Sequence, residues 1–89
     1  MLNTATDFSS QSLAGAELGR TFVVERVCAP VSQPDWGLRL EEIGFIPGER
    51  VSVLTRGVPG GDPLVVRVGL STFALRRAEA DCVCVVPVS

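Results

Sequence analysis

Apolar residues of this chain occur in five separate short stretches, each bounded by turn-forming residues. Val, Phe and Leu dominate these stretches, and β-branched and aromatic side chains favour strands. In the third stretch Leu64, Val66 and Val68 stand two apart, so they share one face of an extended chain. We therefore predict strands at residues 21–28, 51–56, 64–68, 71–75 and 82–86.

A different spacing occurs between the first two strands. Trp36 and Leu40 stand four residues apart, which places them on one face of a helix. Asp35 is a suitable N-cap, and Gly44 is a typical C-terminal stop. The pattern predicts one short helix over residues 36–43.

Turn chemistry separates the predicted elements. Pro47 and Gly48 suit the two central positions of a type II turn. Residues 59–63, Pro-Gly-Gly-Asp-Pro, break the chain between two strands, and residues 76–80 are expected to form a turn or a single helical turn. Five short strands with one short helix after the first strand predict a mainly β fold, a small SH3-like barrel.

Length and composition fit a single domain. The chain has 89 residues, of which 46% are apolar and 20% are charged, enough for one modest core. Residues 1–12 are polar and are expected to be frayed, which leaves residues 13–89 for the barrel. The low share of charged residues makes a homodimer a further expectation, formed through exposed strand edges.

The charge balance argues against several classes of partner. Eight arginines and no lysine face ten carboxylates, a net charge of −2. Nucleic acid and anionic membrane surfaces both require a basic footprint, so neither is an expected partner. No apolar run approaches the roughly 18 residues of a membrane helix, and the N-terminus lacks a signal-peptide pattern. We therefore expect a cytoplasmic location without direct membrane insertion.

The cysteines give the nearest indication of a metal site. The chain has three, and Cys82 and Cys84 stand two apart in the last predicted strand. Two thiolates at this spacing could share a transition metal, but a closed site needs about four ligands and the chain has no histidine. We expect no required cofactor, a weakly or adventitiously bound transition metal being the alternative.

Catalytic machinery is not expected. Without histidine, no nucleophile can be paired with an imidazole base, and the carboxylates are scattered along the chain. The sequence therefore predicts a protein that is not an enzyme.

Three segments of the second half occur in the order of a known family. They are LEEIGFIPGERVSV at residues 40–53, GGDPLVVRV at residues 60–68 and TFALRRAEADCVCV at residues 72–85. Together they resemble the FeoA family of ferrous iron transport proteins. The resemblance implies an SH3-like barrel in the cytoplasm, with the G-protein domain of the membrane transporter FeoB as partner. It also implies that Val83 and Val85 lie on the core face of the last strand, so that Cys82 and Cys84 would both face away from the core. The same barrel occurs at the C-terminus of DtxR-type iron-dependent repressors.

Four residues are candidates for partner binding. Phe45 is either displayed at a partner surface or packed in the core, and Trp36 either packs the helix against the barrel or forms a binding hot spot. Asp62 either bonds its own turn backbone or contacts a partner from an exposed loop. Arg76 either pairs with Glu79 or contacts an acidic patch on the transporter.

Three functions remain open at this point. The first is a regulator of ferrous iron transport that acts by binding the cytoplasmic domain of FeoB. The second is a sensor or carrier that binds Fe(II) or another transition metal itself. The third is a generic SH3-like interaction module related to iron-dependent repressors.

Overall fold

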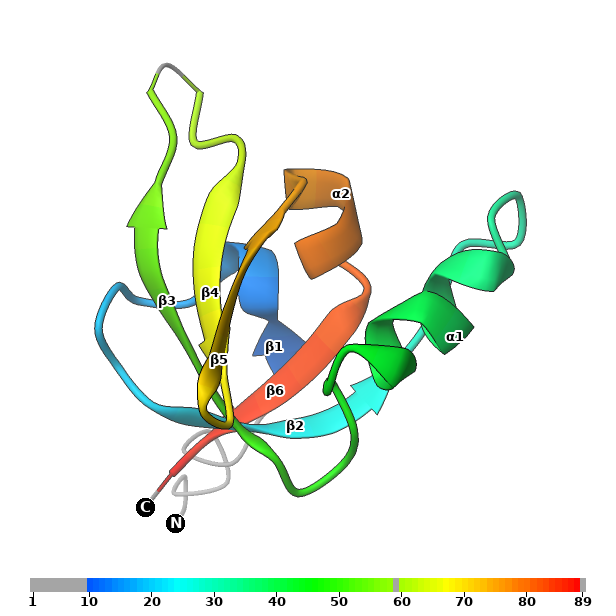
Figure 1. Ribbon diagram of the computed structural model, residues 1–89, viewed down its shortest axis with the longest axis horizontal. Helices are drawn as coiled ribbons and strands as arrows, with labels where there is room; N and C mark the ends of the chain where they lie inside the picture. The colour runs from blue at the N-terminus through cyan, green and yellow to red at the C-terminus, as the bar shows by residue number, and fades with distance from the viewer. Residues whose placement is uncertain (1–9, 59, 89) are drawn as a thin grey trace, which may run out of the picture.

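A computed structural model describes residues 10–58 and 60–88, which form one six-stranded antiparallel sheet (Figure 1). The strand order is β1-β6-β2-β3-β4-β5. The strands are β1 (Gln11–Ser12), β2 (Phe22–Val27), β3 (Arg50–Arg56), β4 (Leu64–Val68), β5 (Ser71–Leu75) and β6 (Val83–Pro87). The five predicted strands are thus all present, and β1 is an addition.

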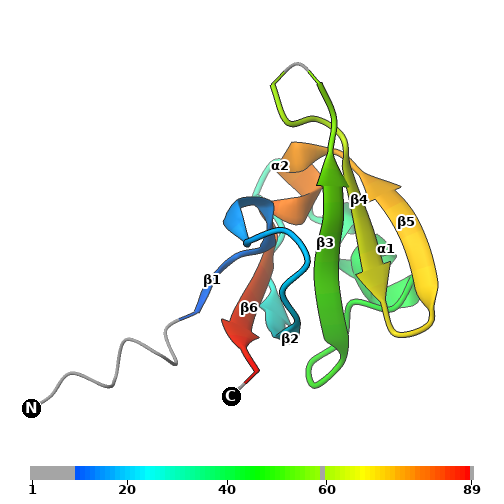
Figure 2. The ribbon, with the colours of Figure 1, turned by 90° about the vertical axis from the view of Figure 1, so that its left-hand side faces the viewer.

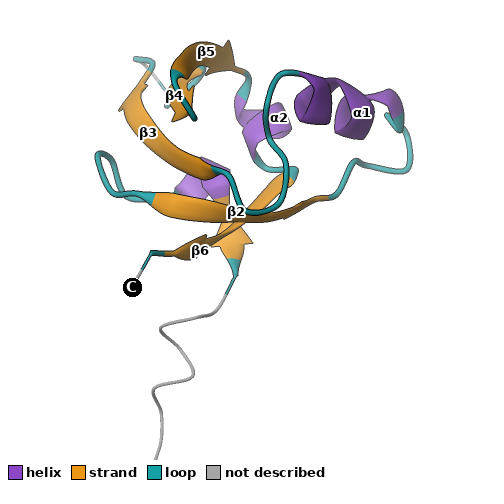
Figure 3. Cartoon of the chain, turned by 60° about the horizontal axis from the view of Figure 1, so that its bottom comes forward, coloured by secondary structure: helices purple, strands orange, loops and turns teal. Residues whose placement is uncertain are grey.

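The sheet curls around its core without closing. Its two edges, β1 and β5, do not pair with each other among the described residues, so "barrel" holds only loosely for the predicted SH3-like shape. Figure 3 shows β3, β4 and β5 arching over β2 and β6. Buried side chains fill the space between, including Phe22, Leu64 and Val85, each at most 1% exposed.

Helical turns cover the open parts of the sheet. The helices are α1 (Asp35–Glu42), α2 (Arg77–Ala80) and the 3-10 turn η2 (Leu13–Gly15). In Figure 2, η2 and α2 lie next to each other between β6 and the strands β3 to β5. Helix α1 lies to the side, beside the end of β2 (Figure 1).

The two ends of α1 are capped differently. At its start, Pro34 is the N-cap and no side chain caps the helix, so the predicted capping role of Asp35 is wrong; Asp35 is the first helical residue. At its end, Gly44 has a φ of +125° and donates to the Glu41 carbonyl, while Phe45 donates to the Leu40 carbonyl at 3.0 Å. This is a Schellman motif, and it confirms the predicted glycine stop.

The turn after α1 also has the predicted chemistry. The amide of Glu49 donates to the Ile46 carbonyl at 3.1 Å, and Gly48 at the third position has a φ of +93°. A type II turn requires a positive φ there. The turn feeds the chain directly into β3.

The N-terminal segment is partly ordered. Gln11 pairs with Val85 and Ser12 with Cys84, so the expectation that residues 1–12 are frayed is wrong for these two residues. They pair because β6 would otherwise leave one edge open to solvent. The expected fraying of residues 1–9 falls outside the described residues. Within the described part, no helix is long and apolar enough to span a bilayer.

Candidate functional site

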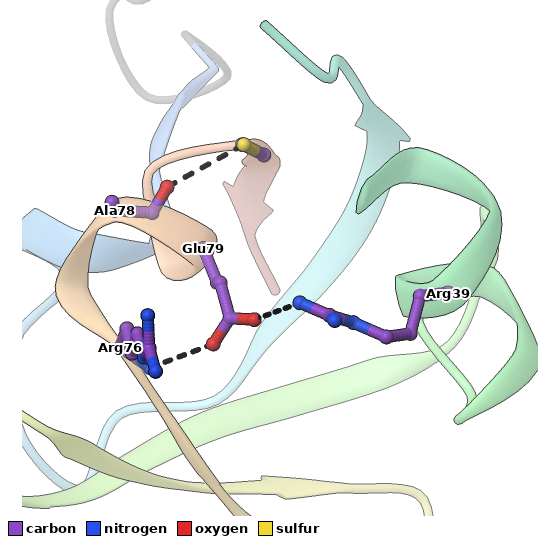
Figure 4. A network of polar contacts seen from close by, with 5 residues as sticks. Arg39, Arg76, Ala78 and Glu79 are labelled. Atoms are coloured by element: carbon purple, nitrogen blue, oxygen red, sulfur yellow. Dashed lines mark hydrogen bonds and ion pairs between the residues drawn. The ribbon is translucent and has the colours of Figure 1, made fainter. Parts of the chain in front are cut away.

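Glu79 of the short helix α2 joins two helices that are far apart in sequence. Its carboxylate accepts from the Arg39 guanidinium of α1 and from the backbone N–H of Arg76 at 2.9 Å (Figure 4). The Glu79 side chain is only 14% exposed, whereas that of Arg39 is 56% exposed. The contact ties α1 to the start of α2, with its carboxylate end largely buried and its guanidinium end exposed.

A second carboxylate reaches the same helix start from the hairpin between β3 and β4. Asp62 Oδ1 accepts from the backbone N–H of Arg77 at 3.0 Å. This corrects the expectation that Asp62 bonds its own turn, because the acceptor lies 15 residues away from its donor. The first N–H groups of a helix lack intrahelical partners, so two carboxylates satisfy two of them here.

The hairpin that carries Asp62 depends on a close backbone approach at Gly57. The amide of Gly57 donates to the Pro63 carbonyl at 2.8 Å, and its carbonyl accepts from Gly61 at 2.9 Å. A Cβ on Gly57 would lie 2.4 Å from the Asp62 carbonyl oxygen. Only glycine leaves room for this approach, and it fixes the position from which Asp62 reaches α2.

Arg76 is left with an available side chain. Because Glu79 pairs with Arg39, the expected Arg76–Glu79 salt bridge does not form; only the Arg76 backbone contacts Glu79. Within residues 10–58 and 60–88, neither Arg76 nor Arg77 forms an ion pair. Both are exposed, so two guanidinium groups stand at the start of α2 beside the hydrogen-bonded carboxylates of Asp62 and Glu79.

The two aromatic candidates have different positions. Phe45 is 0% exposed and belongs to the core, so its predicted display at a partner surface is wrong and its alternative, core packing, holds. The Schellman motif turns its side chain inward beside Leu40. Trp36 is half-buried and packs against the core from α1, which leaves part of its ring exposed.

Exposed apolar side chains accompany these groups. Leu38 of α1 is 62% exposed, Ile46 after α1 is 46% exposed and Val58 in the β3–β4 hairpin is 93% exposed. Exposed apolar side chains and arginine are both common in protein interfaces. Of the four predicted residues, Asp62 and Arg76 both lie at the start of α2, Trp36 lies on α1, and Phe45 lies in the core.

The cysteines do not share one face. Cys82 precedes β6, is 5% exposed and donates through Sγ to the Ala78 carbonyl at 3.4 Å (Figure 4), so the expectation that it faces away from the core is wrong. Val83 and Val85 do face the core, and Cys84 between them is half-buried opposite Arg26.

Burial raises the pKa of the Cys82 thiol and that of the Cys84 thiol above the ordinary value of a cysteine. A protonated thiol is a poor metal ligand, because binding must first displace the proton. Among the described residues, no three or more side chains of His, Cys, Asp or Glu gather in a way that could hold a metal ion.

Three contributors to the site were not predicted from the sequence. Arg39 contacts a residue far along the chain, and Gly57 acts by letting two backbone segments approach closely. Neither arrangement has a local sequence pattern. Arg56 donates to the carbonyls of Ala14, at 3.1 Å, and Ala16, and so fastens η2 to β3. No motif of adjacent residues signals any of these contacts.

Comparison with known proteins places this arrangement in a family. The FeoA domain model matches residues 11–87. A zinc-complexed FeoA from Stenotrophomonas maltophilia, described as a prokaryotic SH3 domain protein and a proposed activating factor of bacterial ferrous iron transport, is 40% identical. The match covers 84% of this chain and 88% of that chain, with a TM-score of 0.76.

More distant structures have the same fold. Iron(II) transport protein A from Clostridium thermocellum is 28% identical over 88% of this chain and 46% of that chain, with a TM-score of 0.73. A manganese-dependent transcriptional repressor, 23% identical over 91% of this chain and 43% of its own length, shows the fold alone, with a TM-score of 0.76. A comparison with curated proteins finds no match. The family model and the 40% identical structure together show that this chain belongs to the FeoA family.

Proposed function

We propose that this chain is a cytoplasmic, non-catalytic accessory protein of bacterial ferrous iron transport. Membership of the FeoA family supports the link to iron, as does the description of the Stenotrophomonas relative as a proposed transport activating factor. The proposed partner is the cytoplasmic G-protein domain of an FeoB-type transporter. Binding would change the rate of uptake without any chemistry on the part of this chain.

The observation that carries the proposal is the arrangement at the start of α2. The Asp62 carboxylate accepts from the backbone amide of Arg77, and the Glu79 carboxylate accepts from that of Arg76. Glu79 also accepts from the Arg39 guanidinium. The side chains of Arg76 and Arg77 remain exposed and, among the described residues, form no ion pair. They are therefore available to an acidic partner surface, on a frame that is already ordered.

Exposed apolar groups on α1 also support the proposal. Leu38 and the exposed part of Trp36 lie on this helix, which Arg39 ties to α2. A partly exposed tryptophan on a helix held in place by an arginine contact is a candidate interface hot spot. We infer that α1, the start of α2 and residues 57–58 and 60–63 of the β3–β4 hairpin form one docking face.

The test is direct binding to the purified G-protein domain of the transporter from the same genome. Immobilised domain should retain this chain in at least one nucleotide state, and Trp36→Ala should reduce retention. Absence of binding with GDP, with a GTP analogue and without nucleotide would overturn the proposal. Circular dichroism of the Trp36→Ala variant distinguishes lost contact from lost fold.

A second candidate function is metal binding by the chain itself, which the zinc in the Stenotrophomonas relative favours. Titration with Fe(II) and Zn(II) under anaerobic conditions tests it. A stoichiometric site that disappears in a Cys82→Ser, Cys84→Ser double variant would support it. Titrations without a saturable site would leave the docking function alone.

A further inference from the structure

The solvent face of the sheet carries a second group of arginines, away from α2. A shallow hollow of about 200 Å³ is lined by Thr21, Arg50, Val51, Ser52, Arg67 and Gly69. Arg50 and Arg67 are exposed, whereas the side chain of Val51 belongs to the core on the other face of the sheet. The hollow therefore combines two cationic side chains and two hydroxyls.

The strand register fixes how these groups lie. Ser52 of β3 is directly opposite Arg67 of β4, and Arg67 is in turn opposite Thr72 of β5. Arg50 stands two residues before Ser52, and its carbonyl accepts from the Gly69 amide at 3.1 Å. Arg50 and Arg67 are thus diagonal neighbours on one face, with Cβ atoms roughly 7–8 Å apart, a span that two arginine side chains easily cover.

Among the residues that the structure describes, neither guanidinium has a charged partner. The ion pairs within the described residues engage Arg20, Arg26 and Arg39, and none involves Arg50 or Arg67. Glu49 lies close, with Oε1 3.7 Å from the position a Cβ on Gly69 would take, yet it pairs with neither arginine. Two like charges facing one hollow repel each other, and a bound anion would relieve that repulsion.

The number of donors indicates the kind of anion. A carboxylate has two oxygens and is satisfied by one bidentate guanidinium. A phosphate group offers at least three oxygens and a charge near −2, which matches two guanidiniums with hydroxyls beside them. From this match we propose that the hollow between β2, β3 and β4 binds a phosphate group, carried either by free phosphate or by a small phosphomonoester.

This site is independent of the proposed transporter contact, because none of its residues lies on α1, on α2 or in the 57–63 hairpin. Failure of one proposal therefore leaves the other intact. The same variants also distinguish the two sites, because Arg77→Gln changes the docking face and leaves the hollow unchanged.

The test is NMR titration of the 15N-labelled chain with inorganic phosphate, at constant ionic strength maintained by chloride. Saturable shifts are expected at the amides of Ser52, Arg67 and Gly69. Arg50→Gln and Arg67→Gln should each weaken binding about tenfold, the worth of one charge-assisted contact. Arg77→Gln, which removes the same charge elsewhere, should leave the affinity unchanged, and Glu49→Gln should increase it.

Two further arms complete the design. Glycerol 3-phosphate binding more tightly than inorganic phosphate would assign the site to phosphomonoesters, and equal or weaker binding would assign it to free phosphate; both support the site. Shifts that do not saturate, or equal weakening in Arg67→Gln and Arg77→Gln, would overturn the proposal, because they indicate general counterion association. Dispersed spectra of each variant establish that the fold is kept.

Discussion

Asp62 Oδ1 accepts from the backbone N–H of Arg77 at 3.0 Å, so a loop carboxylate caps a helix 15 residues further along the chain. The contact joins two of the segments that resemble the FeoA family, residues 60–68 and residues 72–85. One supplies the acceptor, and the other supplies the helix start that needs it. Both belong to the proposed docking face.

Removal of this cap should destabilise the fold. We expect Asp62→Ala to lower the free energy of unfolding by about 1 kcal/mol, the usual worth of a helix N-terminal acceptor. Asp62→Asn keeps an acceptor oxygen and should lose less. Urea denaturation measures both. Asp35→Ala is the control, because Asp35 caps nothing; an equal loss in this control would contradict the assigned role of Asp62.

Gly57 should tolerate no side chain. A Cβ there would lie 2.4 Å from the Asp62 carbonyl oxygen, so Gly57→Ala must move the hairpin backbone. We expect a loss of about 1–3 kcal/mol in urea denaturation, the range of overpacking substitutions. Gly15 has nothing within 4 Å of the same position. A Gly15→Ala variant should therefore be nearly neutral, and a similar loss at both glycines would be inconsistent with the close approach.

The buried thiol of Cys82 should make stability depend on pH in the alkaline range. Burial raises the pKa of Cys82 above its ordinary value of 9.0, so the folded state holds the thiol proton more tightly than the unfolded state. The stabilising contribution is complete below pH 9.0 and is lost as pH rises through the folded-state pKa. Thermal melts between pH 7 and pH 10 should show a smaller alkaline decrease in Cys82→Ala than in the unmodified chain.

The same thiols should differ in reactivity. Cys28 is exposed, whereas Cys82 is buried and donates to the Ala78 carbonyl. Alkylation by iodoacetamide in the native state should label Cys28 first and Cys82 last, because reaction requires an accessible thiolate. Peptide mass spectrometry measures the order. Rapid labelling of Cys82 would show that its turn opens readily.

Local patterns predicted most of the regular structure. The helix stop at Gly44, the turn at Gly48 and the alternation of Leu64, Val66 and Val68 each depend on residues close in sequence, and the structure has each of them. Long-range contacts were beyond such reasoning. The pairing of Gln11 with Val85 and the contact of Arg39 with Glu79 join residues separated by dozens of positions, with no periodic signal.

Tertiary packing determines which of the alternatives holds for the candidate site residues. Phe45 was compatible with either surface or core, since an apolar residue after a helix stop suits both, and only three-dimensional packing places it in the core. For Arg76, a salt bridge to Glu79 was one of two alternatives, and the structure pairs Glu79 with Arg39 instead. The competing Arg39 comes from another element, so its approach could not be foreseen.

Calorimetric titration of this chain into the G-protein domain of its FeoB-type transporter tests the central claim most directly. Arg76→Gln should weaken binding about tenfold, as expected for the loss of one charge-assisted contact. Arg50→Gln removes the same charge from the proposed phosphate site, and this variant should bind the domain like the unmodified chain. Equal affinities for all three proteins, or no heat of binding in any nucleotide state, would contradict docking through the start of α2.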